Sequence, residues 1–337
     1  LGEPITTPPR KEVYGFTVED ANGTNFKSYD WSVLTTVAFG GKSPELMCTA
    51  HEKGARVVLG AFGWDVEKIS DEKYRRSWIQ SHVQRALDGF FDGTNFDFES
   101  PLNASDPKVQ YYTQLVSETT QAFHQAIPGS QVTVDVAWSP SGIDGRYYDY
   151  LGLSKAADLL FVMAYDTRSQ IFGPCVAAAN SPPALDKHGL EAFLAMGIPP
   201  SKLILGLPWY GYTYPCLTPP TSSNFCSIKP VPFRGVNCSD AAGRELSFAT
   251  IMQMLNSSAA GARMWSDDMG SPFFNYKNGD GTVNQIWYDD TESLGIKYRL
   301  AKELQLQGVG FWNLDTLDYG SGSSDTLAMW EAVKEFI

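Results

Sequence analysis

Polar side chains alternate with aromatic ones in the segment Phe91-Asp-Gly-Thr-Asn-Phe-Asp-Phe-Glu99. Side chains on a β-strand point to alternate faces, so Asn95, Asp97 and Glu99 share one face of a strand predicted over residues 94–99. Two carboxylates buried there without partners would be strongly unfavourable, which argues against a purely structural role. Burial and the anion of Asp97 are expected to keep Glu99 protonated, as a general acid requires.

The strand that carries these residues is one of eight predicted along the chain. Short apolar, β-branched runs alternate with helical patterns, which is typical of repeated βα units and a parallel sheet. The runs are Glu12–Phe16, Leu34–Phe39, Arg56–Ala61, Thr94–Glu99, Val132–Trp138, Leu159–Tyr165, Leu203–Pro208 and Val309–Asn313. The prediction is an α/β protein with a (β/α)8 TIM barrel, whose active site belongs at the carboxyl ends of the strands.

One long segment interrupts the barrel pattern between the seventh strand and its helix. Residues 211–289 are rich in Pro, Ser, Asn and Gly, and a loop of that length without structure is unusual. We therefore predict a small inserted α+β subdomain at 211–289. The barrel is assigned residues 1–210 for its first seven strands and residues 290–337 for its completion.

Composition limits the classes of partner. The 337 residues carry a net charge of -12, which disfavours nucleic acid and anionic membrane surfaces. No apolar run reaches the roughly 20 residues that a membrane-spanning helix needs. The chain is therefore expected to be soluble, with a neutral or cationic ligand.

The cysteines and sequons favour the secretory pathway, with a signal peptide already removed. Sequons begin at Asn22, Asn103, Asn237 and Asn256. Cys216, Cys226 and Cys238 lie within 23 residues, whereas Cys48 and Cys175 stand apart in the chain. We predict one disulfide within the group of three and at least one remaining thiol, with the pairing left open.

Motifs for phosphate binding, metal binding, dinucleotide binding and serine hydrolysis are incomplete or absent in the sequence. Gly40-Gly-Lys-Ser43 resembles the end of a phosphate-binding loop, but position 36 is Thr instead of the required Gly. The four histidines show no metal-ligand spacing, and neither Gly-x-Gly-x-x-Gly nor Gly-x-Ser-x-Gly follows a strand. We predict an activity that needs neither metal nor cofactor.

The segment ending at Glu99 resembles the signature of glycoside hydrolase family 18, Asp-Gly-x-Asp-x-Asp-x-Glu on the fourth strand of a barrel. Asp92, Gly93, Asp97 and Glu99 match it, whereas Asn95 occupies the position of the middle aspartate. The third strand also departs, because the family's Ser-x-Gly-Gly appears as Gly60-Ala-Phe-Gly63. Asn95 can hydrogen-bond to Asp97 but cannot share its charge.

Further landmarks of the family end the sixth, seventh and eighth strands. They are Met163-Ala-Tyr-Asp166, Gly206-Leu-Pro-Trp-Tyr-Gly211 and Gly310-Phe-Trp312. Within the family, the chain resembles the chitobiase branch, which also carries Asn at the position of Asn95. Segments that share this similarity include Val132-Thr-Val-Asp-Val-Ala-Trp-Ser-Pro140 and Gln285-Ile-Trp-Tyr-Asp-Asp290.

The resemblance implies substrate-assisted catalysis, in which the substrate's 2-acetamido oxygen is the nucleophile. Glu99 would protonate the glycosidic oxygen and later activate water, while Asp97 would accept the acetamido N–H and stabilise the cationic intermediate. Tyr165 would orient the acetamido carbonyl, and Trp312 would lie under the sugar ring. Further substrate contacts are assigned to Asn95, Tyr14, Met163, Asp166 and Asn313.

The activity implied is hydrolysis of β-1,4-linked N-acetylglucosamine, with exo release from the reducing end of chitobiose cores in lysosomal glycoprotein breakdown. A secreted protein is the other location considered. Two alternatives remain: an endo-chitinase, and a chitinase-like lectin that has lost the acid. The intact Glu99 counts against the lectin.

Overall fold

The computed structural model describes residues 5, 10–19, 22–218, 220, 225–320 and 322–337. The chain divides into two compact units. The first comprises Leu1–Met163, Leu190–Gly206 and Ala301–Asp315, and the second comprises Ala164–Gly189, Leu207–Leu300 and Thr316–Ile337.

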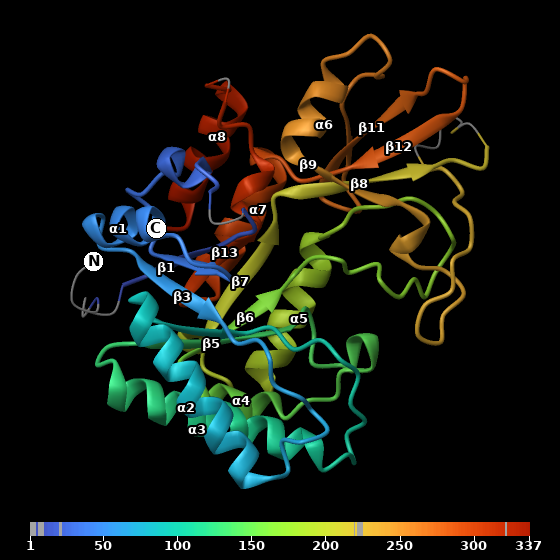
Figure 1. Ribbon diagram of the computed structural model, residues 1–337. Helices are drawn as coiled ribbons and strands as arrows, with labels where there is room; N and C mark the ends of the chain where they lie inside the picture. Colours follow the sequence, from blue (N-terminus) through green and yellow to red (C-terminus); the bar gives the residue numbers. More distant parts are fainter. Residues whose placement is uncertain (1–4, 6–9, 20–21, 219, 221–224, 321) are drawn as a thin grey trace. The chain divides into compact units, whose positions relative to one another are not determined.

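Eight parallel strands close into a barrel, as the sequence predicted (Figure 1). Their order around the barrel is β1, β13, β7, β6, β5, β4, β3, β2. The bounds are β1 (Glu12–Thr17), β2 (Thr36–Phe39), β3 (Arg56–Gly60), β4 (Gly93–Phe96), β5 (Gln131–Ala137), β6 (Leu159–Met163), β7 (Leu203–Pro208) and β13 (Gly308–Trp312). Each strand coincides with a predicted run, although β4 is shorter than expected and ends at Phe96.

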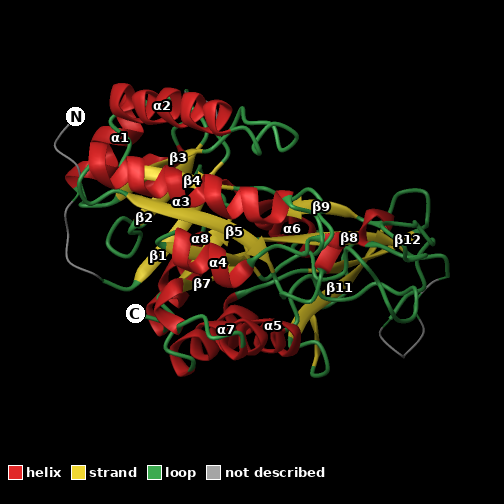
Figure 2. Cartoon of the chain, turned by 90° about the horizontal axis from the view of Figure 1, so that it is seen from below, coloured by secondary structure: helices red, strands yellow, loops and turns green. Residues whose placement is uncertain are grey.

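A helix follows most barrel strands along the chain. These helices are α1 (Pro44–Glu52), α2 (Glu72–Gly89), α3 (Lys108–Ala126), α4 (Tyr150–Ala156), α5 (Pro183–Ala195), α7 (Thr291–Glu303) and α8 (Ser324–Ala332). The exception is β1, which is followed by a short 3-10 helix, η1 (Asn25–Ser28). Within the first unit, α3 lies between α2 and α4 (Figure 2).

The barrel interior contains polar layers instead of aliphatic side chains alone. Glu12 of β1 accepts a hydrogen bond from Gln131 of β5 at 3.3 Å and lies 3.7 Å from Arg56 of β3. One layer further along, the hydroxyls of Tyr14 and Thr133 lie 3.0 Å apart. Since β1 and β5 stand opposite each other in the barrel order, both hydrogen bonds cross the interior.

The second unit contains the sheet inserted between β7 and α7. Its order is β10, β11, β12, β8, β9, and all its pairings are antiparallel. The elements are β8 (Tyr210–Pro215), β9 (Arg244–Ser247), α6 (Phe248–Leu255), β10 (Met264–Ser266), β11 (Ser271–Lys277) and β12 (Val283–Trp287). The prediction of a small subdomain inserted between the seventh strand and its helix is thus confirmed.

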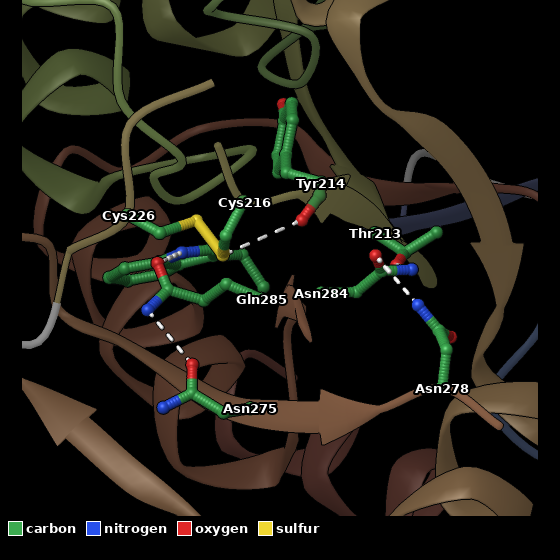
Figure 3. Close-up of a disulfide and its surroundings, with 9 residues drawn as sticks. Thr213, Tyr214, Cys216, Cys226, Asn275, Asn278, Asn284 and Gln285 are labelled. Carbon is green, nitrogen blue, oxygen red and sulfur yellow. Dashed lines mark hydrogen bonds between the residues drawn. A yellow bond between two sulfur atoms is a disulfide. The ribbon is translucent and has the colours of Figure 1, made fainter. Parts of the chain in front are cut away.

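Two disulfides lie in the second unit. Cys216–Cys226 joins the residue after β8 to a later segment (Figure 3), which confirms one disulfide within the predicted group. Cys175–Cys238 links residues separated by 63 positions, a pairing that the spacing did not reveal. Cys48 is outside both disulfides, as expected for at least one remaining thiol.

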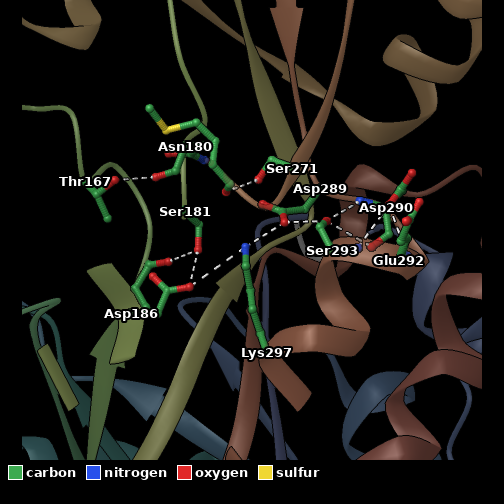
Figure 4. Close-up of polar contacts among 12 residues, drawn as sticks. Thr167, Asn180, Ser181, Asp186, Ser271, Asp289, Asp290, Glu292, Ser293 and Lys297 are labelled. Atoms are coloured by element: carbon green, nitrogen blue, oxygen red, sulfur yellow. Dashed lines mark hydrogen bonds and ion pairs between the residues drawn. The ribbon is translucent and has the colours of Figure 1, made fainter. Parts of the chain in front are cut away.

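A buried ionic cluster, here called the lysine cluster, also lies in the second unit (Figure 4). It consists of Ser181, Asp186, Asp289, Ser293 and Lys297. Lys297 Nζ lies 2.6 Å from Asp289 Oδ1 and 4.0 Å from Asp186 Oδ2, with all three side chains almost fully buried. Ser293 donates to Asp289 at 2.7 Å, and Ser181 donates to Asp186 at 3.0 Å.

None of the described helices combines the length and the apolar character that crossing a bilayer requires.

Candidate active site

Side chains near the end of β4 alternate between the surrounding helices and the barrel interior. The side chains of Thr94 and Phe96 face the helices: Thr94 Oγ1 lies 2.7 Å from His82 Nε2 of α2, and the Phe96 ring packs near Tyr112 of α3. Asn95 points the other way, into the barrel. The predicted alternation is therefore correct within the strand, but Asp97 and Glu99 lie beyond its last residue.

Asn95 is held by the neighbouring strand β5. Its amide donates to Thr133 Oγ1 at 3.0 Å and to Asp135 Oδ1 at 2.8 Å, and it is buried. Thr133 also contacts the hydroxyl of Tyr14 across the barrel. Asn95 and Tyr14, two residues assigned to substrate contacts, thus belong to one hydrogen-bonded group deep in the barrel.

Asp135 is a buried carboxyl without an ion pair among the described residues. Burial raises its pKa well above the ordinary value, and the nearby carboxylates of Asp97 and Glu99 raise it further, while the Asn95 hydrogen bond opposes them. A carboxyl in this setting is neutral, because a buried carboxylate without a cation is very unfavourable.

Asp97 is accessible to solvent at the end of β4, yet the protein around it displaces part of its hydration. This loss of water raises the pKa of Asp97 to about 6, helped by the negative charge of Glu99 and opposed by Arg146. The carboxyl therefore gains or loses a proton in mildly acidic solution. It can respond to a positive charge developing beside it.

Glu99 does not occupy the buried position that we predicted. Its side chain is 55% exposed, and Oε2 lies 2.7 Å from Arg146 Nη1. The expectation of a buried acid was wrong because the chain leaves the strand after Phe96, so Glu99 sits beyond the barrel wall. Exposure suits a group that must reach a substrate.

The remaining candidates in the first unit lie at or directly after the ends of β13 and β6. Trp312 is partly exposed, and its ring lies 5.4 Å from that of Phe16, which in turn contacts Tyr14. Asn313 accepts a hydrogen bond from Asp315 N at 3.0 Å and so forms a turn after β13. Met163, the last residue of β6, is buried.

Tyr165 and Asp166 lie in the second unit, directly after β6 in the chain. Asp166 accepts hydrogen bonds from the hydroxyls of Tyr210 at 2.6 Å and Tyr212 at 3.2 Å. Its backbone N–H donates to Asn180 Oδ1 at 2.7 Å. Asp166 is therefore rigidly held, and the Tyr165 ring packs edge-on to Tyr210 at 6.1 Å.

Sequence reasoning did not assign a role to Asp135 or Arg146. The signal for Asp135 was present, because Thr133 and Asp135 alternate with valines just as Asn95 alternates with aromatic residues. No local pattern marks Arg146, which lies 47 residues from Glu99. In the described part of the chain, no group of three His, Cys, Asp or Glu side chains could hold a metal ion.

Known proteins place this site in a family. Residues 13–316 match glycosyl hydrolases family 18. The chain belongs to glycosyl hydrolase family 18. As a family 18 member it is a glycosidase, and the resemblance inferred from its motifs is confirmed.

Relatives within family 18 extend along the whole chain. Di-N-acetylchitobiase of Mus musculus is 45% identical over 338 residues, covering 99% of this chain and 91% of the relative. The Homo sapiens protein of the same name is also 45% identical, covering 99% and 86%. The class V chitinase structure from Nicotiana tobaccum shares the fold, with a TM-score of 0.76, 18% identity, and coverage of 97% and 100%.

Proposed function

We propose that this glycosidase hydrolyses β-1,4-linked N-acetylglucosamine by substrate-assisted, retaining catalysis. Its substrate is an oligosaccharide with a chitobiose core, from which it releases N-acetylglucosamine at the reducing end. The observation that carries the proposal is the pair at the end of β4: Asp97 with its pKa raised to about 6, and the exposed Glu99 two residues later. The similarity to proteins named di-N-acetylchitobiase supports the substrate class.

The first step needs a proton donor and a nucleophile. Glu99 gives its proton to the glycosidic oxygen as the bond to the anomeric carbon breaks, and the acetamido oxygen attacks that carbon. The leaving sugar departs as an alcohol, and a cationic oxazolinium ring forms. Asp97 accepts the acetamido N–H, and the growing positive charge favours its carboxylate form.

The second step returns the enzyme to its starting state. The carboxylate of Glu99 takes a proton from water, which opens the oxazolinium ring at the anomeric carbon. Two inversions at that carbon retain the β configuration. Tyr165 orients the acetamido carbonyl, and Trp312 supports the sugar ring. Tyr14, Asn95, Met163, Asp166 and Asn313 are assigned to contacts with the rest of the sugar.

Two observations support a location in the lysosome. The disulfides support the secretory pathway, and two raised pKa values support an acidic compartment within it. The two disulfides form and persist in an oxidising environment. Burial raises the pKa of Asp186 to about 7, and that of Asp97 is about 6, so both keep their protons in acid.

Product analysis tests the substrate and the mode of cleavage. The enzyme is incubated with chitobiose, with a core-containing glycan and with a longer chitin oligomer, and products are identified by mass. We expect N-acetylglucosamine as the single small product from each. Dimers and trimers from the chitin oligomer would indicate endo cleavage, and binding without any cleavage would indicate a lectin.

Stereochemistry and a modified sugar test the nucleophile. The new reducing end should appear first as the β-anomer in an NMR time course. Replacing the attacked N-acetylglucosamine by glucosamine removes the acetamido oxygen and should eliminate hydrolysis. A thiazoline analogue of the oxazolinium should bind far more tightly than substrate. Efficient cleavage of the deacetylated sugar would contradict the mechanism.

A further inference from the structure

A loop after β5 pairs with the segment that carries Glu99. Leu102 N donates to Gly145 O at 3.0 Å, and Tyr147 N donates to Leu102 O at 3.1 Å. The loop turns through η2 (Ile143–Gly145), where Gly142 and Gly145 have φ of 74° and 76°, a region that suits glycine. The segment after β4 is therefore held by the neighbouring strand's loop.

Tyr148 of this loop fixes the backbone on both sides of Glu99. Its hydroxyl lies 3.0 Å from the carbonyl oxygen of Phe98 and 2.5 Å from that of Ser100. Its ring stacks on Phe98, with centroids 5.5 Å apart. Glu99 thus has a fixed backbone although its side chain is exposed.

Arg146 of the same loop divides its guanidinium between two carboxylates. Its side chain is only 7% exposed, with Nη1 2.7 Å from Glu99 Oε2 and Nη2 2.9 Å from Asp144 Oδ2. Asp144 is nearly buried, at 12% side-chain exposure. The Nε atom of Arg146 donates to Ile143 O at 3.4 Å, which anchors the guanidinium within the turn.

These contacts bear on the two forms that Glu99 must take. A guanidinium at this distance favours the carboxylate and so opposes retention of the proton. Asp144 carries a negative charge beside the same guanidinium and weakens its effect on Glu99. The other carboxyls near Glu99 are those of Asp97 on its own segment and Asp135 on β5.

We propose that Arg146 is a positioning residue that sets the pH at which Glu99 gives up its proton, and that Asp144 moderates its effect. Arg146 stabilises the carboxylate that acts as base in the second step. The same interaction lowers the upper pH limit of activity, whereas Asp144 raises that limit. The inference rests on the proposed function, because it uses Glu99 as acid and base.

Opposite shifts of the pH profile test this assignment. In Arg146→Met, the upper limb of the kcat/KM profile should move to higher pH by about 0.5 to 1 unit, since Glu99 is half exposed. In Asp144→Asn, the limb should move to lower pH by a smaller amount. Arg146→Lys keeps the charge and should lie close to wild type.

Two further variants separate this effect from altered folding. Arg146→Met leaves Asp144 buried without its cation, so the double variant Arg146→Met/Asp144→Asn is measured as well and should also shift upward. Arg75→Met is the matched control: Arg75 is 3% exposed and lies 2.9 Å from the partly exposed Glu118, away from β4 on α2. Its profile should keep the wild-type limits.

Carboxyl 13C NMR gives a readout that does not depend on turnover. The Glu99 signal is assigned by its absence in Glu99→Gln and titrated in wild type, Arg146→Met and Asp144→Asn. Protonation midpoints that move in opposite directions support the inference even if chitobiose is not cleaved, which would contradict only the proposed function. Unmoved midpoints, or an upward shift in Asp144→Asn, would overturn the roles given to Arg146 and Asp144.

Discussion

Two carboxylate clusters in this chain differ in whether a cation is present. In the first unit, Asp97 and Asp135 are grouped with Asn95, Thr133 and Tyr14, here called the barrel cluster. None of these residues makes an ion pair within the described chain. In the second unit, Lys297 contacts both carboxylates of the lysine cluster.

This difference indicates that one cluster serves catalysis and the other serves stability. A buried lysine compensates the desolvation of its partners, and removing it leaves uncompensated charge. Burial raises carboxyl pKa values in both clusters, but in the barrel cluster Asp97 is also accessible to solvent beside Glu99, where a shifted pKa can serve acid-base catalysis. The barrel cluster should therefore control activity, and the lysine cluster should control the free energy of unfolding.

The largest expected effect is on activity, at the end of β4. Glu99→Gln should lower kcat by roughly 10²–10⁴-fold because it removes the transferable proton. Its free energy of unfolding should remain near wild type, since the side chain is exposed. Glu67→Gln is the matched control, because Glu67 is also exposed and paired with a cation, Lys108. Retained activity in Glu99→Gln would place the acid elsewhere.

The second largest effect is expected on the free energy of unfolding and comes from the lysine cluster. Lys297→Met should lower the free energy of unfolding by about 3–5 kcal/mol at pH 7.5, because two buried carboxylates lose their cation. The loss should be smaller at pH 5, where Asp186 is protonated. Lys302→Met, on the exposed side of the same helix, is the control. Urea unfolding measures both, and equal losses in the two variants would refute a special role for the cluster.

The sequence predicted the barrel cluster better than the lysine cluster, for a physical reason. Alternation along a strand is local, so the faces of Asn95 and Phe96 followed from the sequence. The same alternation continues past the last hydrogen-bonded residue, which is why the strand end at Phe96 and the exposure of Glu99 were missed. Arg146 could not be assigned, because a loop after another strand brings it to Glu99.

Contacts between segments that are distant in the chain could not be predicted from local sequence patterns. Asp186 lies in α5 and Lys297 in α7, and neither residue stands out within its own helix. Cys175 likewise pairs outside the group of closely spaced cysteines. The domain boundaries at 210/211 and 289/290 stay a prediction, as do the assigned roles of the site residues.

The third effect concerns pH. The pKa of Asp186 rises from 3.8 to about 7 in the folded chain, chiefly through burial and against the influence of Lys297. Between these values the folded state holds a proton that the unfolded state has lost, so this contribution to stability is complete below about pH 4 and disappears as pH rises through 7. The free energy of unfolding should therefore fall between pH 5 and 7.5, on the order of 1–3 kcal/mol.

Replacing the titrating group tests that origin. Asp186→Asn cannot ionise and should flatten the fall in urea-unfolding free energy between pH 5 and 7.5. Asp280→Asn is the control, because hydrogen bonds from Thr282 lower the pKa of Asp280 and it has no part in this window. An unchanged slope in Asp186→Asn would show that other groups cause the pH dependence.

The smallest effect is expected when one aspartate in each cluster is replaced by asparagine. Asp97→Asn keeps the shape of the side chain and removes a carboxylate that Glu99 repels, so at pH 7.5 its free energy of unfolding should stay within about 1 kcal/mol of wild type. Asp289→Asn removes the charge 2.6 Å from Lys297 and should lose about 1–3 kcal/mol. At pH 5 the Asp97→Asn difference should be smaller than at pH 7.5, because folded Asp97 is then mostly protonated, although hydrolysis should remain severely impaired. Urea unfolding and hydrolysis rates of both variants at the two pH values decide the matter. An equal loss of stability in Asp97→Asn and Asp289→Asn would mean that both clusters mainly stabilise the fold. The absence of a cation from the barrel cluster would then have no link to catalysis.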